Sequence, residues 1–258
     1  MKKTLTIMTL SALATILSAA PENPVTNLFE KDITFSINFD DGTTNADMAN
    51  GKAAPKRFRS KTTEIAPTGL FGKALLQGRV EYDAALNLDL TQPGTLIYWI
   101  APVKWSAEKP ANGKEPGFNA FYGVGRAKEY GFELISGKMG GQPWGHGHFN
   151  TYVQYMAKPR IKHVNCVTYN KGRTSTWKNG TWKMIAVTWS GGKFAVSIDG
   201  ELSRSSALNK LMTGKTNFFI LESNGSVMLD EVTILNRALS DTEIKKLYDA
   251  VMKVRNTK

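Results

Sequence analysis

Residues 144–163 carry most of the side chains that could recognise a ligand. The candidate ligand-binding residues are Trp144, His146, His148, Tyr152, Tyr155, Arg160 and His163. An aromatic ring can stack on the apolar face of a sugar, and an arginine can hold a sulfate or carboxylate with two parallel hydrogen bonds. These residue types predict carbohydrate recognition, with anionic sugars favoured. The alternative for the aromatic residues is that they lie on strands and fill a core.

The two closely spaced histidines also raise the question of a zinc site. Imidazoles at positions i and i+2 of a strand point the same way, so His146 and His148 could act together, with His163 as a third ligand. A zinc site needs at least three protein ligands in a defined geometry. Because the histidines lie within the glycine-rich run 140–148, the sequence favours a loop whose histidines are solvated or bind sugar hydroxyls.

Asp230 is a candidate of a different kind, because it lies within an apolar strand. Its side chain shares a strand face with Met228, Val232 and Ile234, where an unpaired carboxylate is costly to bury. A calcium ion would offset that cost, since Ca²⁺ binds carboxylate and carbonyl oxygens in a flexible geometry. Hydrogen bonds from loop backbone amides, or from Arg237, would offset it without a metal.

The elements that must position these residues are mostly strands. Residues 33–39 alternate apolar and polar side chains, the pattern of a half-buried strand, and Asp40-Asp41-Gly42 forms a turn signal after them. Residues 182–198 predict two strands joined by a hairpin at Gly191-Gly192, and a further hairpin is expected at Asn224-Gly225. The sequence therefore predicts an antiparallel β protein.

One helix is expected near the C-terminal end. Ser240 and Glu243 have the spacing of a capping box, in which each side chain accepts a hydrogen bond from the other residue's backbone. Apolar residues follow at helical spacing, namely Ile244, Leu247, Tyr248 and Val251. We expect a short amphipathic helix against the outside of a sheet. Residues 104–180 show little patterning, so a loop-rich insertion is expected there.

The first 20 residues have the layout of a secretory signal peptide. Lys2 and Lys3 precede a mostly apolar stretch that ends in small residues. The stretch is shorter than the roughly 20 apolar residues of a spanning helix. We therefore expect the mature chain, residues 21–258, to lack a transmembrane segment and to be secreted, periplasmic or held at the cell surface. The formal net charge of +11 favours anionic partners, but no nucleic-acid-binding motif is visible.

Three passages resemble the laminin-G-like, concanavalin A-like lectin/glucanase jelly-roll superfamily. They are 35–40 with 69–75, 94–102, and 182–200 with 229–244. The most specific is the last part, which reads L-D-E-V-T-I-L-N-R-A-L-S-D-T-E-I. The resemblance implies an all-β fold over residues 21–258: a single domain built as a two-sheet antiparallel jelly-roll sandwich with one short C-terminal amphipathic helix.

The resemblance also implies where a metal and a catalytic site would lie. Members of the superfamily often hold calcium between the end of the first strand and the last strand, which implicates Asp40 and Asp230 as ligands. Glycosidases of this fold use a motif E-x-D-x-x-E on one strand, and retaining enzymes need two carboxyl groups about 5 Å apart. Here Leu86 replaces the final glutamate of a motif that begins at Glu81. Hydrolysis is therefore not expected.

The sequence thus predicts a secreted, noncatalytic carbohydrate-binding module for an anionic polysaccharide, with calcium as its one suggested cofactor. Two alternatives stay open, because a fold alone does not determine function. One is a polysaccharide lyase, since residues 152–163 contain the Tyr, Gln, Arg and His types of jelly-roll lyases without their motif order. The other is a protein-binding adhesion module.

Overall fold

The computed structural model describes residues 24–103, 117–126, 130–138, 149–157, 160–167, 176–208 and 212–257. The strands in chain order are β1 (Ile33–Ile37), β2 (Met48–Ala49), β3 (Arg57–Phe58), β4 (Glu64–Ala66), β5 (Ala74–Asp83), β6 (Gly94–Pro102), β7 (Phe118–Arg126), β8 (Gly131–Lys138), β9 (Phe149–Ala157), β10 (Arg160–Val167), β11 (Lys183–Ser190), β12 (Lys193–Ile198), β13 (Glu201–Ala207) and β14 (Lys215–Leu235). The helical elements are α1 (Pro24–Phe29), the short 3-10 segment η1 (Glu30–Asp32) and α2 (Asp241–Asn256).

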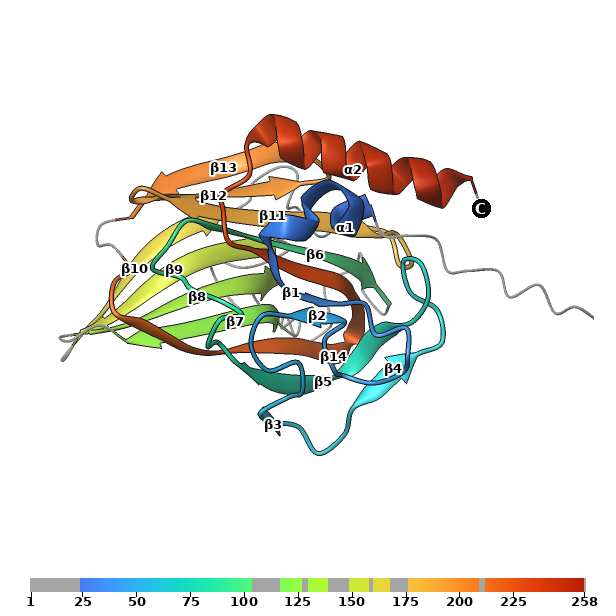
Figure 1. The fold of residues 1–258 in the computed structure, drawn as a ribbon, viewed down its shortest axis with the longest axis horizontal. Helices are drawn as coiled ribbons and strands as arrows, with labels where there is room; N and C mark the ends of the chain where they lie inside the picture. The colour runs from blue at the N-terminus through green and yellow to red at the C-terminus, as the bar shows by residue number, and fades with distance from the viewer. Residues whose placement is uncertain are drawn as a thin grey trace, which may run out of the picture.

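The strands form one antiparallel sheet that curls at β14 into two layers (Figure 1). The first layer contains β13, β12, β11, β6, β1 and the second half of β14. The second layer contains β10, β9, β8, β7, β5 and the first half of β14. The short strands β3 and β4 pair with β5. This arrangement confirms the predicted all-β jelly-roll sandwich.

The hairpin predicted at Asn224-Gly225 is wrong, because β14 continues through it. Residues 215–224 pair with β7 and β5, and residues 227–235 pair with β6 and β1. At the junction Gly225 has a φ of 81°, and Ser226 donates from its backbone N–H and its hydroxyl to Asn224 Oδ1. The turn-forming residues therefore bend the strand from one layer to the other without reversing it.

Residues 104–180, where a loop-rich insertion is expected, contain strands in the part that the structure describes. Four strands, β7 to β10, make up most of the second layer. In β7 and β8 the alternation is hidden because glycines stand at positions where the pattern needs a side chain. A Cβ on Gly125 would come within 2.0 Å of the Phe132 ring, so this position must lack a side chain. An apolar residue on the opposite face, Ile135, obscures the pattern further.

Two hydrophobic cores hold the layers and the helices together. The main core lies between the layers, and the second lies between the first layer and the helices. Figure 1 shows α2 lying across the outside of that layer. The apolar stripe of α2 is buried there, and the Tyr248 ring stacks on Trp99 with centroids 5.9 Å apart. None of the helices within the described ranges is long and apolar enough to cross a membrane.

The start of α2 and the surroundings of β1 test two local predictions. The capping box is confirmed: Ser240 Oγ accepts from Glu243 N at 3.3 Å, and Glu243 Oε2 accepts from Ser240 N at 2.8 Å. The expectation of a half-buried first strand is wrong, because all five residues of β1 are buried. Thr34 Oγ1 donates to the Asn87 carbonyl at 2.7 Å, so a neighbouring loop covers the face that alternation left to solvent.

Candidate functional site

The outward face of the second layer carries polar and aromatic side chains across β7, β8 and β9. Alternation along each strand places Tyr122, Glu133, Tyr152 and Gln154 opposite the core-facing residues. We call these four residues the outward-face row. Tyr122, Tyr152 and Gln154 are half-buried, so part of each stays accessible. The row is therefore a surface on which a ligand could lie.

Glu133 is the centre of the outward-face row. Its Oε1 accepts a hydrogen bond from the Tyr122 hydroxyl, and its Oε2 accepts one from Gln154 Nε2 at 3.0 Å. Gln154 is also the register partner of Glu133 on the adjacent strand. Glu133 is 9% exposed as a residue, and its carboxylate is held by neighbours on both sides. Because the four members come from three adjacent strands, with two of them on β9, the sheet itself fixes the geometry of the row.

The tyrosine hydroxyls of the row are donors rather than bases. Burial raises the pKa of Tyr122, and its hydrogen bond to Glu133 and the charge of Glu133 raise it further. Burial raises the pKa of Tyr152 as well, and the charge of Glu133 adds to the effect. A general base works best when its pKa lies near the working pH. Both shifts move away from that condition, so these phenols are suited to binding hydroxyl-rich ligands.

Tyr152 lies in the row, but Tyr155 does not. Tyr155 is 1% exposed in the main core, with its ring 5.7 Å from that of Tyr130 in an edge arrangement. This corrects the prediction that Tyr155 binds ligand at the surface. The physical reason is alternation: residues three apart on a strand point to opposite faces.

The other predicted residues fall outside the side chains that the structure describes. Arg160 and His163 lie on β10, where His163 is the backbone register partner of Gln154. Trp144, His146 and His148 lie outside the described residues. Sequence reasoning missed Tyr122 and Glu133. The signal for Glu133 was a polar residue between Phe132 and Leu134, a strand pattern that glycines on either side obscured.

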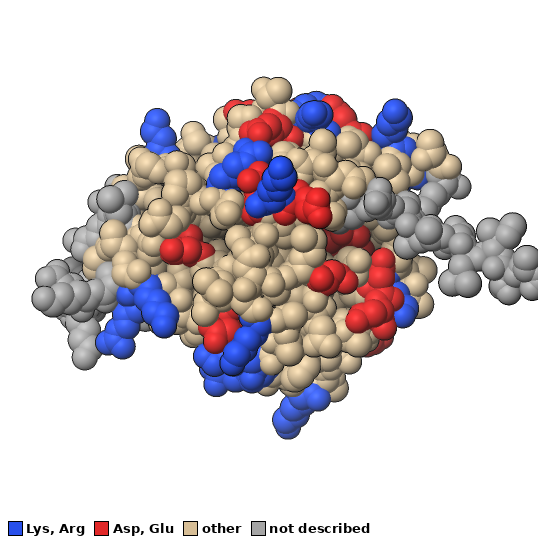
Figure 2. Space-filling model, in the orientation of Figure 1, with Lys and Arg blue, Asp and Glu red and all other residues tan. Residues whose placement is uncertain are grey.

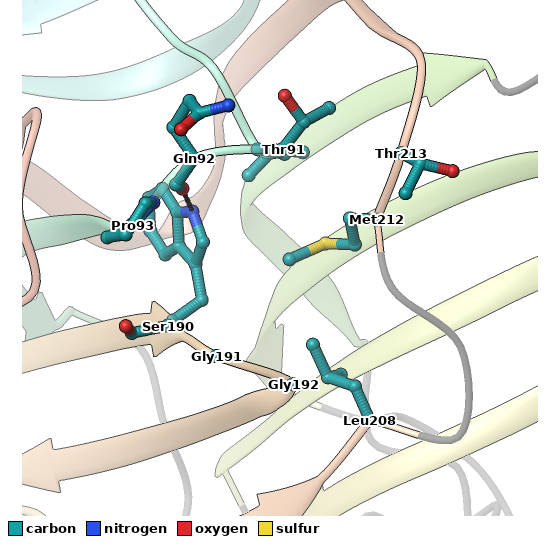
Figure 3. Close-up of a pocket in the computed structure, with 11 residues that line it drawn as sticks. Thr91, Gln92, Pro93, Ser190, Gly191, Gly192, Leu208, Met212 and Thr213 are labelled. Carbon is teal, nitrogen blue, oxygen red and sulfur yellow. Dashed lines mark hydrogen bonds between the residues drawn. The ribbon is translucent and has the colours of Figure 1, made fainter.

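A cavity of about 220 Å³ lies at the end of the sandwich, beside the β11–β12 hairpin. Its lining residues are Leu90, Thr91, Gln92, Pro93, Trp189, Ser190, Gly191, Gly192, Leu208, Met212 and Thr213. Figure 3 shows Leu208 and Met212 pointing into the space across from Gln92 and Pro93. Trp189 Nε1 donates to the Gln92 carbonyl at 2.7 Å. The indole N–H is therefore used within the wall, and the cavity is a second place where a small ligand could lie.

The two predicted metal ligands lie against the same loop, residues 69–73. Asp230 Oδ2 accepts from Leu70 N at 2.7 Å, and its Oδ1 accepts from Glu231 N at 2.8 Å. Asp40 Oδ1 accepts from Lys73 N at 2.7 Å. Burial raises the pKa of Asp230 well above its usual value, and the charges of Glu231 and Asp40 add to the effect. The carboxylate is therefore held by backbone amides in an environment that disfavours its charge.

This donor set covers only part of a calcium shell. Calcium takes about six to eight oxygen ligands, whereas no group of three Asp, Glu, His or Cys side chains gathers for a metal in the part of the chain that the structure describes. Arg237, the other partner considered for Asp230, pairs instead with Asp32 and Glu243. The backbone amides are the partners that the structure shows, and calcium binding stays a prediction.

The chain matches the model of one known protein family. The model of the family described as the concanavalin A-like lectin/glucanases superfamily, Laminin_G_3, matches residues 77–245. Among curated proteins there is no match.

Several solved structures are similar. Domain 4 of AbnA, a GH43 extracellular arabinanase from Geobacillus stearothermophilus solved with arabinotriose, has a TM-score of 0.57 and 20% identity, covering 84% of this chain and 98% of that one. The binding domain of Paraclostridial Mosquitocidal Protein 1 has a TM-score of 0.56 and 18% identity, covering 86% and 52%. A botulinum neurotoxin type C structure, from a protein whose cell entry depends on two ganglioside molecules, has a TM-score of 0.60 and 14% identity, covering 88% and 53%. This chain thus spans about half of the two toxin chains, and identities this low show a shared fold alone.

Proposed function

Because the chain belongs to the concanavalin A-like lectin/glucanase superfamily, we propose that it is a noncatalytic carbohydrate-binding module. The observation that carries the proposal is the outward-face row, in which Tyr122 and Gln154 hold the Glu133 carboxylate from two sides. The complexes and activities of similar structures support it: one domain was solved with arabinotriose, and one toxin depends on gangliosides.

The row suits a sugar because it offers donors and acceptors in alternation. An ionised carboxylate has about four acceptor sites, and Glu133 uses two of them within the protein. The remaining sites can accept sugar hydroxyls, while the Tyr152 ring can pack against a sugar face and its phenol adds a hydrogen-bonding group beside it. Since the strands fix these groups before a ligand arrives, little conformational entropy is lost on binding.

A polysaccharide lyase would use similar residue types in a different electrostatic setting. A tyrosine that removes a proton from a uronic acid needs a lowered pKa, whereas the pKa values of Tyr122 and Tyr152 are raised. This difference favours binding over elimination. The appearance of unsaturated products that absorb in the ultraviolet, on incubation with uronate polymers, would replace the binding proposal with the lyase.

The finer parts of the proposal concern the ligand and the compartment. We propose an anionic polysaccharide, because the formal net charge of +11 is still +9 once Lys2 and Lys3 are removed with residues 1–20. We also propose export to the periplasm, the cell surface or the medium, directed by residues 1–20. N-terminal sequencing of protein recovered from cell fractions tests the second point. A cytoplasmic chain that retains residues 1–20 would contradict it.

Replacing Tyr152 with alanine is expected to weaken carbohydrate binding by about tenfold. Loss of one ring contact and one hydrogen bond is worth about 1–2 kcal/mol, and 1.4 kcal/mol corresponds to a factor of ten in affinity. Tyr152→Phe, which removes the hydroxyl alone, should weaken binding less. Isothermal titration calorimetry measures both, on ligands first identified with an array of sulfated, uronate-bearing and neutral polymers.

Two matched variants make this result specific. Tyr155→Phe removes a tyrosine hydroxyl, as Tyr152→Phe does, but from a residue in the core three positions along the strand. Ser190→Trp fills the cavity beside the β11–β12 hairpin. Both should bind carbohydrate like the wild type. Loss of binding in Ser190→Trp, with Tyr152→Ala unaffected, would move the site to the cavity. No binding of any polymer by the wild-type protein would reject the carbohydrate-binding function.

A further inference from the structure

Basic side chains gather at the edge of β5, beside the outward face. Lys56, Arg57 and Arg59 all approach the carboxylate of Glu81. Lys56 Nζ lies 3.9 Å from Oε1, and Arg57 Nε lies 2.9 Å from Oε2. Arg59 contacts Oε2 through its Nε and a terminal nitrogen. We call Lys56, Arg57 and Arg59 the basic cluster. Figure 2 shows basic side chains concentrated in the region of β3 and β5.

The basic cluster holds more positive charge than its carboxylate needs. Three cations face one anion, which leaves an excess of two positive charges. A neighbouring arginine, Arg79, does not share Glu81, because its Nε lies 3.2 Å from Glu222. A cluster that served only to neutralise Glu81 would be complete with a single cation. The surplus charge therefore points to an anion that comes from outside the chain.

The buried Glu81 carboxylate orients the basic cluster from within the protein, and the basic side chains themselves are partly exposed to solvent. The Glu81 side chain is fully buried, whereas the side chains of Lys56, Arg57 and Arg59 are 50%, 56% and 28% exposed. The Arg59 guanidinium also lies over the Phe218 ring, 5.1 Å from its centroid. Each guanidinium has five N–H donors, and contact with one carboxylate leaves several of them unused. A sulfate or carboxylate could accept bidentate hydrogen bonds from these.

The basic cluster and the outward-face row share one face of the sheet. In register across five strands, Glu81 lies opposite Ile220, Ile220 opposite Tyr122, Tyr122 opposite Ile135, and Ile135 opposite Tyr152. Adjacent strands lie about 4.8 Å apart, so four spacings separate the two ends by about 19 Å. That distance is longer than a single sugar but suits an extended polymer.

We propose that the basic cluster is a subsite for the anionic groups of a polysaccharide whose sugar rings lie on the outward-face row. The inference rests on the proposed carbohydrate-binding function and adds to it both a place and a ligand chemistry. The recognised group is an oxyanion, carried either as a sulfate ester or as a uronate carboxylate. In this arrangement the row contacts the sugar and the cluster selects the charged polymer.

The test compares one polymer with and without its charged groups. Arg57→Gln/Arg59→Gln is expected to bind a sulfated polymer about 100-fold more weakly or worse, since each lost charge-assisted hydrogen bond weakens binding by about tenfold or more and the variant loses at least two. Binding of the chemically desulfated polymer should stay within about twofold of the wild type. A uronate polymer and its carboxyl-reduced form make a second pair, and the pair that responds identifies the oxyanion. Lys246→Ala, on the exposed face of α2, is a charge control that should leave both affinities unchanged.

A third variant distinguishes loss of polymer binding from loss of folding. Removing both arginines leaves Glu81 buried with Lys56 alone, which could destabilise the fold. Adding Glu81→Gln removes that buried charge, and this triple variant should stay folded by circular dichroism yet lose the sulfated polymer. Equal affinity of the folded triple variant and the wild type for every charged polymer overturns the subsite, as does equal loss of charged and uncharged forms. Wild-type binding of neutral polymers alone also overturns the subsite but leaves the carbohydrate-binding function in place.

Discussion

Asp230→Ala is expected to lower the free energy of unfolding by about 2–4 kcal/mol. The side chain is fully buried, and its two oxygens accept the backbone hydrogens of Leu70 and Glu231. Alanine leaves both N–H groups buried without an acceptor, and each such loss costs about 1–3 kcal/mol. Removing the carboxylate also ends its own desolvation cost, so the net effect falls below the sum of the two losses. Urea denaturation measures the difference.

The effect of this substitution should depend on pH. The pKa of Asp230 is raised in the folded protein, so the folded state binds more protons than the unfolded state above the unfolded pKa of about 3.9. Stability from this group is therefore complete below about pH 4 and declines as the pH rises toward the folded pKa. The gap between wild type and Asp230→Ala should be widest near pH 4 and narrower at pH 7. A gap that widens with pH would contradict this view of Asp230.

Calcium gives the same variant a second use. If calcium binds beside Asp40 and Asp230, millimolar calcium should raise the melting temperature of the wild type at pH 7, because a ligand that binds only the folded state stabilises it. The chelator EDTA should reverse the rise, and Asp230→Ala should not show it. Magnesium at the same concentration is the ionic-strength control. Identical melting curves in calcium and in chelator would reject the predicted calcium site.

Trp99→Ala is expected to cost about 3–5 kcal/mol, the usual range for truncating a buried aromatic residue. Trp99 is fully buried in the core beneath the helices, and its ring stacks on that of Tyr248 with an interplanar angle of 11°. Truncation opens a cavity under α2 and removes part of the surface on which the helix packs. Thermal unfolding followed by circular dichroism should show a lower melting temperature.

Two further variants separate the ring from the rest of the side chain. Trp99→Phe should cost much less than Trp99→Ala, because phenylalanine keeps most of the packing and removes an indole N–H that has no hydrogen-bond partner among the described residues. Tyr248→Ala should lie between them, since Tyr248 is only half-buried. A loss in Trp99→Ala no larger than in Trp99→Phe would show that α2 does not depend on this stack.

The parts of the fold that could be predicted are those set by neighbouring residues. The Gly191-Gly192 turn joins β11 and β12 as its composition predicts, and the Ser240 capping box starts α2. Asn224-Gly225 carries an equally strong turn signal but bends β14. The difference is that each half of β14 pairs with strands far away in the sequence, and no local pattern reports those partners. Glycines interrupt the alternation of β7 and β8, so the sequence did not predict those two strands.

In the candidate site, too, local features could be predicted from the sequence and long-range contacts could not. Tyr152 could be predicted from its residue type, and alternation along β9 would have excluded Tyr155. The pairing of Glu133 with Tyr122 and Gln154 depends on strand register, which the sequence alone does not reveal. The convergence of Arg57 and Arg59 on Glu81 depends on a two-residue strand at a sheet edge. Such sites depend on packing between residues far apart in the sequence. Residue types can therefore suggest single members of a site, but they do not predict which members lie together.

The position of β14 in the chain has a consequence for the order in which the protein folds. β1, β5, β6 and β7 all pair with β14, yet each is made before it, and β1 lies about 200 residues upstream of its partner. Closing a loop of that length before any pairing has formed is entropically unfavourable. While the ribosome is still making the chain, the earlier strands therefore lack their common partner. The two layers can therefore close on each other only after residue 235 has emerged from the ribosome.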